Sequence, residues 1–178
     1  MSDDDHDLAR RACAGDRPAF RQLLERYYDT VYRVAYRYTR NIEDAEDIAQ
    51  EVCMGLARKL HSFGGRSRFS TWLYSVAINA CRDHSRKAQS ASTLQANYAM
   101  FREMDEADHK DDQRRLTWLG EAIAGLEPKL RETAILVLSE DQSHAEAARA
   151  LGCAETTVSW RMHEVRKKLK TLLETSDD

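Results

Sequence analysis

The feature that most constrains this 178-residue chain is the spacing of its apolar residues, which recur at steps of three and four. That spacing places successive side chains on one face of an α-helix. A long helix is predicted after Asp16 and Pro18, because Asp can cap a first turn and Pro lacks an N–H that would be unpaired there. Its apolar face comprises Phe20, Leu24, Tyr27, Val31, Val34 and Tyr38. We therefore expect an all-α fold.

Two more helices are predicted before residue 88. The first has an inward row made of Ala45, Ile48, Val52, Leu56 and Leu60. Gly64 and Gly65 interrupt the helical pattern, since glycine is a poor helix former. The next inward row consists of Phe69, Trp72, Leu73, Val76 and Ala80, and the outward side of the same helix is predicted to carry Thr71, Ser75, Asn79, Arg82 and Arg86.

The last third of the chain predicts a second helical unit. Ser143 and Glu146 form a capping-box signature that starts a short helix, and Gly152 ends it. The final helix has an inward row made of Val158, Met162, Val165, Leu169 and Leu172, and an outward row of Thr156, Trp160, His163 and Lys167. A short helix, a glycine turn and a longer exposed helix indicate a helix-turn-helix, whose outward row can reach base edges. A plain helical hairpin with a basic, solubilising end is the alternative.

The segment between the two units differs in composition from both. It lacks apolar periodicity, and its part "REMDEADHKDD" carries six acids against two bases. Such a composition is typical of a linker. We expect two small helical domains, residues 1–87 and 113–178, joined by a flexible linker at 88–112.

Charge is distributed unevenly along the chain. The formal net charge is only −3, which does not indicate a nucleic-acid partner. Between residues 66 and 87, however, a single acid, Asp83, stands among five bases: Arg66, Arg68, Arg82, Arg86 and Lys87. This region predicts a phosphate-facing surface, and the neighbouring Phe63 and Phe69 could stack on unpaired bases. The alternative for Phe69 is a place in the core.

Metal, membrane and enzyme functions find little support. The cysteines at 13, 53, 81 and 153 match neither a zinc site nor a disulfide framework, and Cys81 with His84 would supply only two ligands. We expect no metal and no cofactor. No stretch approaches the roughly 20 apolar residues that cross a bilayer, and no signal core is present, so we expect a cytoplasmic protein. No phosphate-cradling glycine loop or catalytic triad context is found, so we expect no enzyme.

Two blocks of the sequence resemble the extracytoplasmic-function type of alternative bacterial sigma factor. The block "NIEDAEDIAQEVCMGLARKLHSFGGRSRFSTWLYSVAINACRDHSRK" is similar to sigma region two. The block "GLEPKLRETAILVLSEDQSHAEAARALGCAETTVSWRMHEVRKKL" is similar to region four. The resemblance implies a protein that binds core RNA polymerase, directs it to promoters and is controlled by an anti-sigma factor.

The resemblance also implies roles for particular residues. The polymerase contact falls on Asp47, Gln50, Glu51 and Met54. Loop 63–69, with Arg66 and Arg68, lies where the family captures a flipped base of the minus-ten element. The resemblance implies that Asn79, Arg82, Arg86 and Lys87 contact that element and the adjoining duplex. The residues implied to face the minus-thirty-five element are Ser159, Trp160, His163 and Glu164. Those available to bind phosphates are Arg161, Arg166, Lys167 and Lys168.

Some residues depart from the family pattern. Family members commonly carry a basic residue where this chain has Ser159, a small polar residue where it has Trp160, and Arg where it has Glu164. The promoter preference should therefore differ from the common one. Two alternatives remain: a sigma mimic that sequesters an anti-sigma factor, and a simple helix-turn-helix repressor. The repressor leaves the first block unexplained, and the mimic has no need of the basic stripe.

Overall fold

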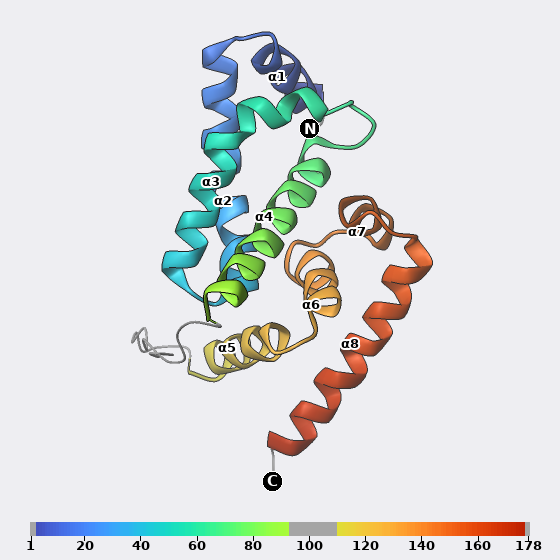
Figure 1. The fold of residues 1–178 in the computed structure, drawn as a ribbon. Coiled ribbons are helices and arrows are strands. Elements are labelled where there is room, and N and C mark those ends of the chain that lie inside the picture. Colours follow the sequence, from blue (N-terminus) through green and yellow to red (C-terminus); the bar gives the residue numbers. More distant parts are fainter. Residues whose placement is uncertain (1–2, 93–109, 177–178) are drawn as a thin grey trace.

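The structure is a computed structural model that describes residues 3–92 and 110–176, and these residues form helices joined by short connections (Figure 1). The N-lobe contains α1 (Asp3–Cys13), α2 (Arg17–Thr39), α3 (Ile42–Lys59), the 3₁₀ turn η1 (Leu60–Ser62) and α4 (Phe69–Ser92). The C-lobe contains α5 (Lys110–Ala124), α6 (Pro128–Ala134), the π-helical turn η2 (Ile135–Ser139), α7 (His144–Leu151) and α8 (Glu155–Ser176). The predicted all-α fold is confirmed.

In the N-lobe, α2, α3 and α4 pack together and α1 lies against α2. The predicted start of α2 is confirmed, because the Asp16 carboxylate accepts a hydrogen bond from the backbone N–H of Ala19 at 3.1 Å. Asn41 caps α3 in the same way. The inward rows meet in a core where Val34, Ile48 and Leu73 are almost fully buried.

The C-lobe holds the predicted helix-turn-helix. Ser143 and Glu146 form the capping box at the start of α7, and Gly152 ends that helix with a φ of 66°. Val158 and Met162 are fully buried on the inner side of α8. This burial anchors α8 to α6 and α7 and leaves its other side outward.

The two lobes lie directly against each other. Helix α4 packs along α7, and α2 contacts α5 and η2 (Figure 1). Buried apolar residues of both lobes belong to one continuous cluster. The sequence therefore located the two helical units but did not reveal their contact, which arises because the alanine-rich α7 presents a smooth face to α4.

The boundaries of the predicted linker also differ from the structure. Helix α4 continues to Ser92 and α5 begins at Lys110, so both ends of the 88–112 segment are helical. Residues 93–109 lie outside the described residues, and the flexible linker remains a prediction there.

Candidate nucleic-acid and polymerase interfaces

The outward side of α8 is open to solvent. Exposed side chains along it are Thr156, Ser159, Trp160, His163, Arg166, Lys167 and Lys168, whereas Arg161 and Glu164 are half-buried. Trp160 is 61% exposed, which is unusual for so large an apolar ring. The Ser159 hydroxyl lies 2.9 Å from Nδ1 of His144, so α7 helps to position it. A helix with a locked inner side and a free outer side can enter a groove of DNA without repacking.

The predicted polymerase contact is a second open surface. Asp47, Gln50, Glu51 and Met54 are all exposed on α3, and Met54 is 77% exposed. Helix α3 lies on the side of the N-lobe away from α7 and α8 (Figure 1). An exposed thioether among acids suits docking of another protein, because methionine adapts its shape to a partner.

The loop between η1 and α4 forms an aromatic corner. The Phe63 ring is half-buried and meets Phe69 and Trp72 at centroid distances of 5.4 Å. A hollow of about 610 Å³ beside it is lined by residues that include His6, Cys13 and Gly65. Arg66 is exposed, and Arg68 reaches the C-lobe, where it pairs with Glu146 at 3.1 Å.

Phe69 does not lie on this surface. Its side chain is only 1% exposed, because it begins α4 on the inward row and packs against Tyr27 at a centroid distance of 5.1 Å. The prediction that Phe69 contacts DNA is corrected accordingly: its ring supports the loop from below. Phe63 is the aromatic residue of this loop that remains accessible.

The basic stripe on α4 is only partly accessible. Asn79, Arg86 and Lys87 are exposed, but Arg82 is held by the C-lobe. Its guanidinium donates from Nε and Nη2 to the two oxygens of Glu132, at 2.7 and 2.5 Å. These hydrogen bonds raise the pKa of Arg82 above its usual value. On the same face Thr71 is 2% exposed, although the helical pattern placed it outward.

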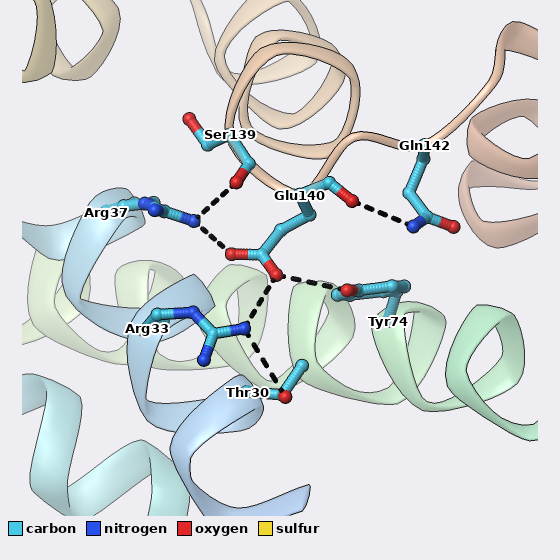
Figure 2. A network of polar contacts seen from close by, with 7 residues as sticks. All are labelled: Thr30, Arg33, Arg37, Tyr74, Ser139, Glu140 and Gln142. Carbon is cyan, nitrogen blue, oxygen red and sulfur yellow. Dashed lines mark hydrogen bonds and ion pairs between the residues drawn. The ribbon is translucent and has the colours of Figure 1, made fainter.

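A second polar cluster joins the lobes (Figure 2). The buried carboxylate of Glu140 accepts hydrogen bonds from Arg33 at 3.0 Å, from Tyr74 at 3.0 Å, and from Arg37. Arg37 also donates to the backbone carbonyl of Ser139 at 2.9 Å. Burial, followed by the Glu140 charge, raises the pKa of Tyr74, so its hydroxyl stays a donor.

Sequence reasoning missed these two clusters, although it assigned one of their members, Arg82, to DNA. The stretch "KLRETAILVLSE" predicted a buried central helix, yet it contains Glu132 and ends at Glu140. Acidic residues in an otherwise apolar, buried segment require partners, because an unpaired buried carboxylate is strongly unfavourable. The need of Glu132 and Glu140 for partners was therefore the one signal in the sequence that could have indicated these clusters. The partners themselves, Arg33, Arg37 and Arg82, are far away along the chain.

Metal and membrane sites are absent from the part of the chain that the structure describes. No group of three His, Cys, Asp or Glu side chains within 3–92 and 110–176 could hold a metal ion. Cys81 is fully buried, which raises the pKa of its thiol to about 12, and His84 lies 3.4 Å from Asp44. No described helix combines the length and hydropathy that a membrane span requires.

Comparison with known proteins gives consistent matches over both lobes. The family model of sigma-70 region 2 matches residues 23–91, and that of sigma-70 region 4 matches residues 116–169. The ECF RNA polymerase sigma factor SigM of Mycobacterium tuberculosis is 32% identical over 171 residues, which cover 95% of this chain and 84% of SigM. SigW of Bacillus subtilis is 31% identical over 170 residues, covering 89% and 91% of the two chains.

Solved structures share the fold. CnrH, in complex with the cytosolic domain of CnrY, superposes with a TM-score of 0.73 at 25% identity over 97% of this chain and 98% of CnrH. The sigma factor RpoE of Bartonella quintana, in complex with the anti-sigma factor NepR, has a TM-score of 0.66 at 23% identity over 87% of this chain and 96% of RpoE.

Proposed function

The chain belongs to the ECF family of RNA polymerase sigma factors, and from that premise we propose how its surfaces divide the work of promoter recognition. The family is one of transcription factors and not of enzymes. In this proposal α3 binds core RNA polymerase, α8 reads duplex DNA, and the N-lobe loop and α4 bind the melted element. The synthesis of RNA belongs to the polymerase, and we expect the protein to act with it in the cytoplasm.

The exposed outer side of α8 carries this proposal. Trp160 and His163 extend from a helix whose Val158 and Met162 are locked in the C-lobe core, so their positions in a groove would be well defined. Hydrogen bonds and apolar contacts to the edges of nucleobases specify sequence. The neighbouring basic residues Arg166, Lys167 and Lys168 are suited to bind phosphates. The half-buried Glu164 can accept a hydrogen bond from a cytosine amino group but not from phosphate. We therefore propose that α8 binds the minus-thirty-five element with its own sequence preference.

The aromatic corner is proposed as the capture site for an unpaired base of the minus-ten element. Phe63 offers an accessible ring beside the 610 Å³ hollow, and Arg66 offers a free positive charge next to it. Stacking on an aromatic ring, together with a basic group for the backbone, is how proteins hold single strands. Asn79, Arg82, Arg86 and Lys87 continue this surface along α4 toward the duplex.

Control by a protein partner is part of the proposal. The family resemblance carries the expectation of an anti-sigma factor, and CnrH, which shares 25% identity with this chain, was solved with the cytosolic domain of CnrY. We propose that an anti-sigma factor binds this chain and competes with core polymerase. The two would compete for the exposed α3 surface around Met54.

Run-off transcription from a promoter library with purified core polymerase tests the function. We expect transcripts only when the chain is added to core enzyme, and the enriched promoters would give its motif. The variant Met54→Asp places a charge in the proposed docking surface and should reduce binding to core enzyme. Because Met54 is 77% exposed, this variant should fold normally.

Two results would contradict the proposal. One is tight, sequence-specific binding of the free chain to promoter DNA, which would indicate a simple repressor. The other is an absence of transcripts with a chain that binds an anti-sigma factor, which would indicate a sigma mimic. The exposed Ala57→Ser on α3 serves as the control for Met54→Asp, since it should leave polymerase binding unchanged.

A further inference from the structure

Two carboxylates of the C-lobe are buried in the contact between the lobes. Glu132 is 1% exposed and Glu140 is 8% exposed. Removing a carboxylate from water is unfavourable unless charged or hydrogen-bonding partners replace the water. In both cases the partners come from the N-lobe, so these two side chains are satisfied only while the lobes remain together.

The two carboxylates are bound as a phosphate would be. Arg82 holds both oxygens of Glu132 with two parallel hydrogen bonds, the geometry that arginine also uses on phosphate. Glu140 receives donors from Arg33, Arg37 and Tyr74 (Figure 2). Each acidic side chain therefore occupies a ready-made anion site on the N-lobe.

One of these sites lies in the proposed DNA surface. Arg82 belongs to the α4 stripe that we assign to the minus-ten region, and Thr71 on the same face is covered. Arg68 of the capture loop is likewise paired with Glu146 of α7. The contact between the lobes thus blocks part of the surface that DNA would need.

We propose that Glu132 and Glu140 are internal ligands that hold the free chain in a closed form unable to bind the minus-ten region. This inference rests on the proposed function and adds a regulatory device to the same surface. Arg33, Arg37, Tyr74, Arg82, Glu132 and Glu140 together form what we name the interlobe latch. Promoter binding requires the latch to open, so that a phosphate replaces the Glu132 carboxylate at Arg82.

The polarity of the latch suits reversible opening. When the lobes part, the arginines and glutamates of the latch regain water, whereas the apolar residues with which α7 packs on α4 become exposed and favour closing again. Helix α3 lies on the side of the N-lobe away from α7 and α8 (Figure 1), and Asp47, Gln50, Glu51 and Met54 are exposed in the closed form, so core enzyme can bind the closed chain and then promote opening. The latch therefore restricts DNA binding without restricting polymerase binding.

The double variant Glu132→Gln, Glu140→Gln tests the latch in the full chain. Both substitutions keep the shape but weaken the hold of the arginines. We expect binding of a promoter fragment with an unpaired minus-ten region, without core enzyme, to tighten by about tenfold or more, since a closed fraction above 90% reduces apparent affinity by that factor. Small-angle X-ray scattering should show a larger radius of gyration than for the unaltered chain.

A charge-matched control separates the latch from a general gain in attraction to DNA. The double variant Glu25→Gln, Glu174→Gln removes two exposed carboxylates outside the latch and should change DNA binding little. A second opening variant, Thr71→Trp, adds bulk to the covered face of α4 without changing charge, and it should also expand the chain. It provides the test if the glutamine variant folds poorly.

The outcomes distinguish the latch from the proposed function. If both opening variants bind DNA no better than the control, or if the unaltered chain is already extended in solution, the latch is wrong. Run-off transcription by the unaltered chain with core enzyme would then still support the proposed function. If no variant yields transcripts with core enzyme, the proposed function fails, and the latch loses its premise.

Discussion

The two surfaces that we assign to DNA differ in accessibility. The outer side of α8 is exposed along its length, with Trp160 and His163 in solvent. On the corresponding side of α4, Thr71 is buried and Arg82 is held by Glu132 of the other lobe. Both helices are amphipathic and both carry polar residues on the side away from their own core. The sequence of a helix therefore sets which side faces its own core, whereas its neighbours decide whether the other side is free.

The difference has a functional consequence. In this conformation the free chain can present α8 to duplex DNA while α4 is engaged by Glu132. The chain would then bind duplex DNA first and capture the unpaired strand only afterwards, once α4 is released.

The first prediction contrasts the aromatic residues of the two surfaces. Phe69→Ala should lower the free energy of unfolding by about 3–5 kcal/mol, because it leaves a cavity in the N-lobe core. Trp160→Ala should change it by less than about 0.5 kcal/mol, because the ring is exposed. Urea denaturation followed by circular dichroism measures both. Equal effects would mean that the assignment of Phe69 to the core, or of Trp160 to the surface, is wrong.

The second prediction divides the α8 surface itself. In the complex with core polymerase, Trp160→Ala should cost about 1–3 kcal/mol on the best promoter and relax its sequence preference, as expected for a base contact. Lys167→Ala should weaken binding by a similar factor on all promoters and reduce the salt dependence by about one phosphate contact. Filter binding at several salt concentrations separates the two. A uniform loss for Trp160→Ala would place its ring against the backbone.

The third prediction concerns α7, which lies between the two surfaces. Hydrogen bonds from the Ser143 side chain and backbone lower the pKa of Glu146, so the charged form stabilises the fold. That contribution is present above the ordinary pKa of 4.5 and is lost as the pH falls through the lowered value. Glu146→Gln should therefore destabilise the chain by about 1 kcal/mol at pH 7, and the difference should shrink below pH 4.5.

The matched control for this third prediction is Arg68→Ala. It removes the exposed ion pair to Glu146 but keeps the cap, and exposed pairs contribute little, so its effect should be smaller. Thermal unfolding between pH 3 and pH 7 gives both curves. A constant difference between the unaltered chain and Glu146→Gln across this range would contradict a role for the carboxylate charge.

The sequence predicted the local features well because each had a local cause. The start of α2 followed from Asp16 and Pro18, and the turn of the helix-turn-helix followed from Ser143, Glu146 and Gly152. The outward direction of Trp160 followed from helical spacing against Val158 and Met162. For these elements, neighbouring residues in the chain contain the whole physical reason.

The lobe contact had no such local cause. Arg33 and Glu140 are 107 residues apart, and nothing near either residue indicates the other. Helical spacing placed Thr71 outward because it assumes that a helix has one buried side. Helix α4 packs against both lobes, so a second side is buried as well. Phe69 was assigned to DNA because its neighbours are basic, although its place on the inward row argued for burial. Long-range contacts of this kind depend on the tertiary arrangement.

The π-helical turn η2 gives the segment 135–139 a particular dependence on its length. The Glu140 N–H donates to the carbonyl of Ile135, five residues back, at 3.1 Å, where an α-helix would use the fourth. A π-helical turn accommodates one residue more than an α-helical turn, so it absorbs an extra residue without turning the side chains that follow. Inserting a further residue within this segment would turn the following side chain by about 100° around the axis. The carboxylate would then leave its arginines although every amino acid of the cluster was still encoded, and such gene variants would differ in self-restraint while their recognition helix stayed the same.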